Sequence, residues 1–184
     1  MLEIEKILNL EGFWMFEKFG EFDSYQEINR AAAAQKAEGD EEALIALAIE
    51  NGIDREDAED YMDGCMEELT TATLAAVGKL KIEKEDLKLE GFLVDIADEL
   101  SAWALDNENL AIAVRRKGMA LAGYIARIID GGFDQKIRVD KRIVDLTQRA
   151  KKIMNNNPLL GGSPTVRQRK EIAYKYYLGI GARK

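Results

Sequence analysis

Hydrophobic residues recur at intervals of three and four positions over most of the chain, which is the pattern of amphipathic helices. The clearest case is Ala111–Asp130, AIAVRRKGMALAGYIARIID, where apolar and small residues at positions 114, 118, 121, 125 and 128 share one stripe. We therefore expect one long helix there. Further helices are expected over residues 2–19, 24–38, 41–51, 55–63, 66–81, 92–106, 141–154 and 164–178.

Residues that favour helix ends mark most of these segments. The expected N-caps are Ser24, Asp40, Asp54, Asn107, Asp140 and Ser163. Glu27 is placed for a capping box with Ser24, and glycines at 39, 52 and 64 end three of the segments. The only alternating run, KIRVD at 136–140, is too short to propose a sheet. The expected fold class is all-α, a compact bundle of about eight helices.

The net charge changes sign along the chain. Residues 1–110 hold 29 acidic and 9 basic residues, a net charge of −20, whereas residues 111–184 hold 5 acidic and 17 basic residues, a net charge of +12. The charged stretch KIEKEDLKLEG at 81–91 is the best candidate for a boundary. We expect an acidic N-terminal helical subdomain over 1–82 and a C-terminal helical subdomain with a basic surface over 83–184, or one domain that contains both.

The composition excludes several kinds of catalytic site. The chain has no histidine, which rules out Ser-His-Asp and Cys-His catalysis and histidine-containing zinc sites. Because Cys65 is the only cysteine, a thiolate zinc site and an intramolecular disulfide are ruled out too, and a reducing cytoplasm is the expected location. The N-terminal MLEIEKILNL does not resemble a signal peptide, and no apolar run approaches about 20 residues, so we expect no membrane contact.

Two stretches have the composition of ligand-binding loops without their spacing. An EF-hand beginning at Asp54 would need glycine and glutamate where DREDAEDYMDGC has Glu59 and Cys65. GGSPTVRQRK at 161–170 lacks Walker spacing and a preceding strand, although the helix N-terminus after its glycine pair could hold an anion. We expect no catalytic residues, no cofactor and no metal site.

Basic side chains of the C-terminal half supply the candidate binding residues. On the expected long helix, Arg116 and Arg127 flank Ala120 and Gly123 on one line, so that a partner's backbone could approach closely. Nearer the C-terminus, arginine and lysine alternate with tyrosine, which suits contact with phosphates and stacking on bases. The candidate residues for binding a partner or nucleic acid are Arg115, Arg116, Lys117, Arg127, Arg167, Arg169, Lys170 and Lys175. The alternative is that they form ordinary solvated faces or pair with the acidic half.

Three stretches resemble proteins carried by phages and mobile elements of gut Firmicutes. They are EFDSYQEINRAAAAQKAEGDEEALIALAIENGIDREDAEDYMDG at 21–64, AVRRKGMALAGYIARIID at 113–130 and YKYYLGIGARK at 174–184. Some small acidic proteins from that setting are anti-CRISPR proteins that inhibit type II CRISPR effector nucleases, and the chain resembles the family active against type II-A systems. The resemblance implies an inhibitor that is not an enzyme, and it assigns no role to particular residues.

The expected function is stoichiometric binding to a type II effector nuclease with its guide RNA, which blocks DNA binding or cleavage. Such an inhibitor needs no catalytic residues, and an acidic and a basic surface could contact protein and nucleic acid in one complex. The first alternative is a nucleic-acid-binding accessory protein of a phage or conjugative element, whose basic helices contact RNA or DNA directly. The second is a histidine-free nuclease that uses carboxylates and a divalent metal. The acidic half could also mimic nucleic-acid phosphates, and Phe13, Trp14 and Phe16 would suit a homodimer.

Overall fold

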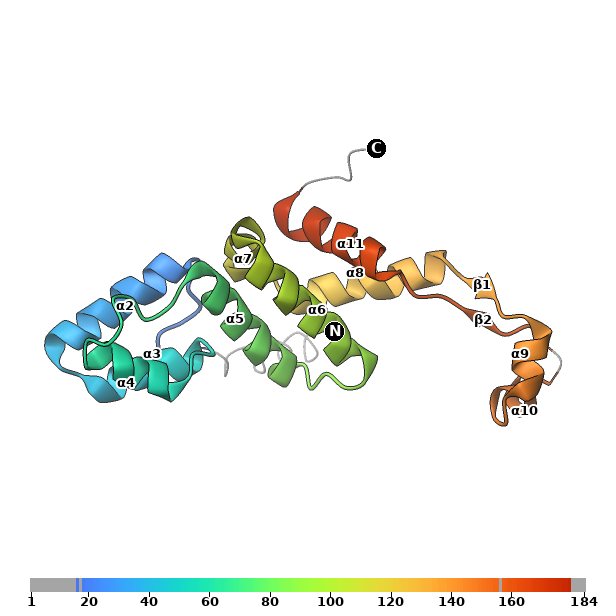
Figure 1. Cartoon of the computed structure of the whole chain (residues 1–184), viewed down its shortest axis with the longest axis horizontal. Coiled ribbons are helices and arrows are strands. Elements are labelled where there is room, and N and C mark those ends of the chain that lie inside the picture. Colours follow the sequence, from blue (N-terminus) through green and yellow to red (C-terminus); the bar gives the residue numbers. More distant parts are fainter. Residues whose placement is uncertain (1–15, 17, 156, 180–184) are drawn as a thin grey trace, which may run out of the picture. The chain divides into compact units, whose positions relative to one another are not determined.

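A computed structural model of the chain describes residue 16 and residues 18–155 and 157–179. These residues form ten helices and one pair of two-residue strands (Figure 1). Eight of the helices have eight or more residues, which confirms the expected all-α class with about eight helices. The expected helix over 2–19 lies almost entirely outside the described residues, as do Phe13 and Trp14.

The chain divides into two units, Met1–Ala122 and Gly123–Lys184, which we call the N-terminal and the C-terminal unit. This division differs from the boundary predicted at residue 82, which falls inside helix α5 (Ala72–Asp86). α5 continues into the charged stretch and packs against α6 (Phe92–Asp106) and α7 (Glu108–Arg115). The charged stretch therefore lies inside the N-terminal unit and does not separate two units. The N-terminal unit has a net charge of −17 and the C-terminal unit a net charge of +9.

The first helices of the N-terminal unit are α2 (Tyr25–Glu38), α3 (Glu41–Glu50) and α4 (Arg55–Met62). Side chains of Ser24 and Asp40 accept N-terminal amides of α2 and α3, as predicted, and Gly39 ends α2 in the left-handed conformation. Asp54 occupies the N-cap of α4 without a side-chain hydrogen bond. The helix expected from residue 66 begins at Ala72, because the Thr71 hydroxyl accepts the amide of Leu74 and caps it.

Small residues let α5 approach the turn after α3 closely. A Cβ added to Gly78 would overlap the backbone oxygen of Asn51, and one added to Gly52 would overlap the backbone of Gly78. Around this contact, aliphatic side chains such as Leu44, Leu47 and Leu69 are fully buried. The core of the N-terminal unit is therefore closed tightly over α2, α3, α4 and α5.

The long helix expected over Ala111–Asp130 is interrupted. α7 ends at Arg115 and α8 (Leu121–Asp134) begins six residues later, with Gly118 at a φ of +76° between them. The prediction of one continuous helix is wrong because backbone groups at 114–119 bond to a side chain of α5 instead of continuing the helical ladder. Asn107 caps α7 as predicted, accepting the amide of Leu110.

Helices α8 and α11 (Val166–Leu178) carry the side chains that pack inside the C-terminal unit. Between them, β1 (Ile137–Arg138) pairs antiparallel with β2 (Leu160–Gly161), and α9 (Lys141–Leu146) and α10 (Ala150–Met154) follow β1. The expected helix over 141–154 is thus two helices, because Thr147 has an extended backbone. α11 begins after a Thr165 cap that forms a capping box with Gln168, two residues later than the predicted Ser163 cap.

Candidate binding surfaces

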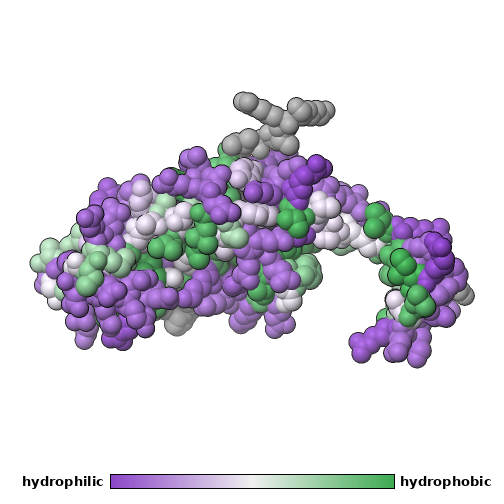
Figure 2. Space-filling model, viewed as in Figure 1, coloured by the Kyte–Doolittle hydropathy of each residue, from purple (hydrophilic) through white to green (hydrophobic). Residues whose placement is uncertain are grey.

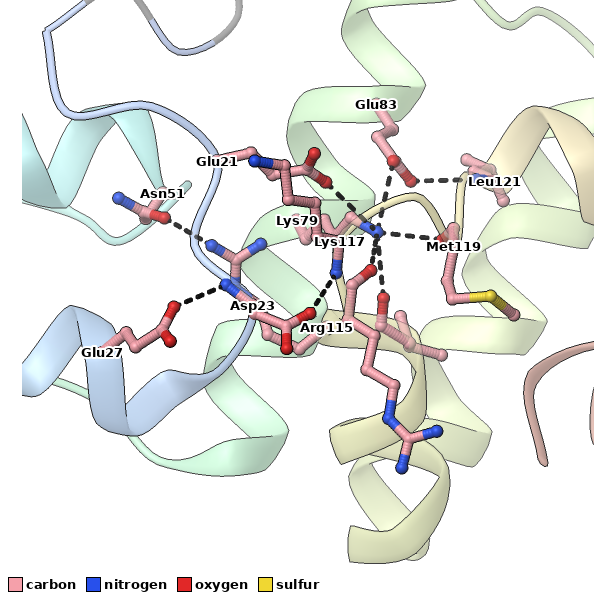
Figure 3. A network of polar contacts seen from close by, with 12 residues as sticks. Glu21, Asp23, Glu27, Asn51, Lys79, Glu83, Arg115, Lys117, Met119 and Leu121 are labelled. Atoms are coloured by element: carbon pink, nitrogen blue, oxygen red, sulfur yellow. Dashed lines mark hydrogen bonds and ion pairs between the residues drawn. The ribbon is translucent and has the colours of Figure 1, made fainter.

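Lys79 lies on the buried face of α5, with only 1% of its surface exposed. Its Nζ donates to the carbonyl oxygens of Val114 at 3.0 Å, Arg116 at 3.1 Å and Met119 at 2.9 Å (Figure 3). A lysine has three N–H donors only as the ammonium, so these bonds identify the charged form. The positive charge stands where α7 presents carbonyls without helical partners, at the negative end of the helix dipole.

Glu83, one turn further along α5, completes this arrangement. One of its carboxylate oxygens lies 3.5 Å from Lys79 Nζ, and the other accepts the amide of Leu121 at 3.0 Å, at the first residue of α8. Burial lowers the pKa of Lys79, and the carboxylate of Glu83 opposes this shift. Burial raises the pKa of Glu83, and Lys79 opposes it. The pair therefore holds the end of α7 and the start of α8, which explains why the helix breaks here.

Arg115 is not available to a partner, because only 2% of its surface is exposed. Its Nη2 donates to the Asn51 side chain at 2.7 Å (Figure 3). Asn51 in turn donates to the carbonyl of Leu47 at 2.8 Å. Burial lowers the pKa of Arg115, and Glu21 opposes this shift. The prediction that Arg115 contacts a partner is corrected: the side chain joins α7 to the C-terminal end of α3.

Arg116 and Lys117 are exposed on the connection between α7 and α8. The Arg116 carbonyl is one of the oxygens bound by Lys79, and the backbone amide of Lys117 donates to Asp23 at 3.0 Å. Because the helix is interrupted here, Arg116 does not share a helical line with Arg127. The predicted row of two arginines around small residues is therefore wrong.

In the C-terminal unit, α8 and α11 bring two of the candidate residues together. Arg127, Ile172, Lys175 and Tyr176 line an open hollow. The Arg127 guanidinium lies 4.3 Å from the centre of the Tyr176 ring and donates to the carbonyl of Gly123 at 2.6 Å. This packing also explains why position 123 is a glycine, because a Cβ there would overlap the Tyr176 hydroxyl. The small residue that was predicted to admit a partner admits a tyrosine of the same unit.

The remaining candidates lie on α11 and differ in exposure. Arg167 and Lys170 are exposed; Arg167 lies 3.9 Å from Glu171, and the Lys170 ammonium lies 6.0 Å from the centre of the Tyr174 ring. Arg169 is half-buried and donates to the carbonyl of Pro164 at 2.8 Å, while its own carbonyl accepts the Tyr124 hydroxyl. Arg169 therefore contributes to packing within the unit. The exposed candidates of this unit are Arg127, Arg167, Lys170 and Lys175.

The buried pair Lys79 and Glu83 was missed in the sequence, although a signal was present. The other residues of this α5 face are Ala72, Ala75, Ala76 and Leu80, all of them buried. Two charges spaced four residues apart on an apolar face are typical of an internal ion pair. Their partners carry no such signal, because Lys79 bonds to backbone carbonyls at the end of α7 and in the connection after it, and Glu83 bonds to the backbone amide at the start of α8.

The described residues contain no cluster of acids and cysteine that could hold a metal ion. Within the same part of the chain, no helix has the length and apolar content to cross a membrane. No family model, curated protein or solved structure matches the chain.

Proposed function

We propose that the protein is a stoichiometric inhibitor of a type II CRISPR effector nuclease, binding the nuclease with its guide RNA and blocking DNA binding or cleavage. The observation that carries the proposal is the separation of charge between the units, −17 in one and +9 in the other. The resemblance of three stretches to proteins of phages and mobile elements, a setting that includes anti-CRISPR proteins, suits the same partner.

Each unit suits a different component of such a complex. A nuclease of this class holds its heteroduplex in a positively charged channel, which an acidic unit can approach as a phosphate backbone does. The exposed cations of α8 and α11, with the half-buried Tyr174 and Tyr176 of α11, suit the phosphates and unstacked bases of a guide RNA. Binding both components at once requires no catalytic group.

A titrated cleavage assay tests this proposal. The nuclease with guide RNA is mixed with increasing amounts of the protein, and cleavage should disappear as the protein reaches molar equivalence with the nuclease. Complete inhibition at a small fraction of equivalence would indicate turnover and contradict stoichiometric binding. Undiminished cleavage across several type II effectors would contradict the choice of partner.

A charge reversal locates the contact. The double variant Arg127→Glu with Lys175→Glu should weaken inhibition at least tenfold, because it places carboxylates in the hollow. The control Arg30→Glu with Arg55→Glu makes the same change in net charge at exposed positions of the N-terminal unit, and it should inhibit normally. Equal loss in both double variants would show that net charge alone matters, and equal inhibition by both would move the contact away from the hollow.

Direct nucleic-acid binding is the second candidate, favoured by the neighbouring Arg127–Tyr176 and Lys170–Tyr174 pairs. It predicts that the purified protein alone shifts RNA or single-stranded DNA in a gel, and that the affinity falls steeply with salt. The inhibitor proposal instead predicts a stable complex only when the nuclease and guide RNA are both present.

A further inference from the structure

Large aliphatic side chains lie in solvent on α9 and α10, which we call together the tip. Leu146 is 88% exposed, Ile153 is 77% exposed and Ile143 is 58% exposed. Hydrophobic side chains gather on this segment among hydrophilic ones in Figure 2. Three aliphatic residues this exposed in two adjacent short helices exceed the scattered apolar residues of an ordinary surface and are typical of an interaction site.

These side chains are not part of the tip's own packing. Val144 is the buried residue of α9, and it lines a small cavity of about 60 Å³ with Val139, Met154 and Leu159. Leu146, Ile143 and Ile153 are absent from that lining. The tip therefore has a separate inner side, and its outer aliphatic side chains remain for a partner.

Basic side chains surround the exposed aliphatic ones. Lys141 forms an ion pair with Asp145 at 2.8 Å, and Arg142 forms one with Asp140 at 2.9 Å. Lys151 donates to the Asp145 carbonyl at 3.5 Å. Arg149 and Lys152 form no ion pair within the described part of the chain. Two tips brought face to face would repel each other, so the partner surface must combine apolar side chains with carboxylates.

The N-terminal unit has such a surface. Ile49, Ile53, Ile82 and Glu85 are among the residues that line an open hollow. Ile49 is more than half exposed, and Ile53 is buried. The two cations at this hollow are already paired, since Lys81 lies 3.0 Å from Asp54 and Arg55 lies 2.7 Å from Glu59. Glu85 forms no ion pair among the described residues.

We propose that the tip of one copy docks in the isoleucine-lined hollow of a second copy, with Leu146 and Ile153 against the isoleucines and Lys152 of α10 near Glu85. The contact is head-to-tail, joining the basic unit of one chain to the acidic unit of another. Its apolar part supplies affinity, and its charges set the orientation and make association weaken with salt. This contact is independent of the proposed inhibitor function.

Sedimentation velocity of the full chain tests the proposal. At low salt the protein should sediment as a species larger than a single 20.7 kDa chain, and Leu146→Asp with Ile153→Asp should return it to the mass of one chain. The control Leu105→Asp with Ile129→Asp alters aliphatic side chains that are also exposed and should leave association unchanged. Circular dichroism should show all variants folded, because the altered side chains lie in solvent.

A charge exchange gives the sharper result. Glu85→Lys alone and Lys152→Glu alone should each weaken association at least fivefold, and the two together should restore it. A parent protein that is a single chain at every concentration and salt would overturn the proposal, as would association that survives the tip double variant. Loss of nucleic-acid binding in that variant, with a monomeric parent, would show that the tip meets nucleic acid instead.

Discussion

The N-terminal unit buries two of its basic side chains almost completely, whereas the C-terminal unit keeps four of the candidate basic side chains exposed. In the N-terminal unit, Lys79 and Arg115 are almost completely buried and bond to backbone oxygens or an amide side chain. In the C-terminal unit, Arg127, Arg167, Lys170 and Lys175 are exposed. The two buried basic residues of the acidic unit are therefore structural, whereas these four basic residues of the C-terminal unit lie at its surface. Net charge alone would have assigned Arg115 to the wrong group.

The largest expected effect is the loss of the buried ammonium. Lys79→Met should lower the free energy of unfolding by about 3–5 kcal/mol, because Glu83 and the carbonyls at the end of α7 lose their partner in a buried site. Denaturant unfolding of the full chain measures the change. Lys81→Met removes an exposed lysine two residues away and should change stability by at most about 1 kcal/mol. Similar losses in both variants would contradict the structural role of Lys79.

One glycine-to-alanine substitution in each unit compares how tightly the two units are packed. Gly78→Ala should destabilise the chain by about 1–3 kcal/mol, although alanine favours helices, because its Cβ would overlap the Asn51 carbonyl oxygen. Gly161→Ala in β2 meets no atom within 4 Å and should be nearly neutral. Thermal unfolding measures both. A stabilising Gly78→Ala would show that the approach of α5 to the turn after α3 is looser than described.

The buried Glu83 should make the stability of the N-terminal unit depend on pH. Burial raises the pKa of Glu83, so the folded chain holds this proton more tightly than the unfolded chain. The contribution of Glu83 to the free energy of unfolding is therefore largest below the ordinary glutamate pKa. It falls as the pH rises through the raised pKa of Glu83 in the folded chain. Glu83→Gln should destabilise by about 1–3 kcal/mol near pH 5 and by less near pH 7.

Denaturant unfolding at both pH values checks this prediction for Glu83→Gln. Glu85→Gln, an exposed change on the same helix, provides the control and should show no difference between the two. A loss that grows with pH would mean that the attraction of Lys79 outweighs burial at Glu83.

The smallest expected effect is in the C-terminal unit. Arg127→Ala removes an exposed cation over the Tyr176 ring, at 4.3 Å from its centre, and should cost only about 0.5–1 kcal/mol of stability. The same substitution should weaken binding to the partner much more than it weakens the fold. Parallel measurements of unfolding and inhibition separate these effects, and a loss of stability comparable to that of Lys79→Met would erase the contrast between the units.

Local signals in the sequence accounted for most helix ends. Ser24, Asp40, Asn107 and Asp140 cap their helices with side-chain hydrogen bonds, as their positions predicted. The interruption after Arg115 could not be found in this way, because AIAVRRKGMALAGYIARIID has helical spacing throughout. The group that ends α7 belongs to Lys79, which lies 35–40 residues earlier in the sequence.

The candidate site was predictable to the extent that it depends on local sequence. Arg127 and Lys175 were candidates by charge alone, and the packing of α8 and α11 brings them to one hollow with Tyr176. Arg115 and Arg169 have the same side chain as the exposed arginines, but long-range contacts bury them fully or partly. Whether the exposed residues bind nucleic acid or protein remains a prediction.

The burial of the Lys79 ammonium also provides a way to measure how often the N-terminal unit opens. Amine-reactive reagents modify lysines that meet solvent as the free amine, and Lys79 is shielded while its hydrogen bonds hold. The exposed Lys81 on the same helix and Lys88 just after it should react quickly in the native protein. Lys79 should react only as often as the unit opens. Mass spectrometry of the modified peptide would therefore measure local opening without a denaturant.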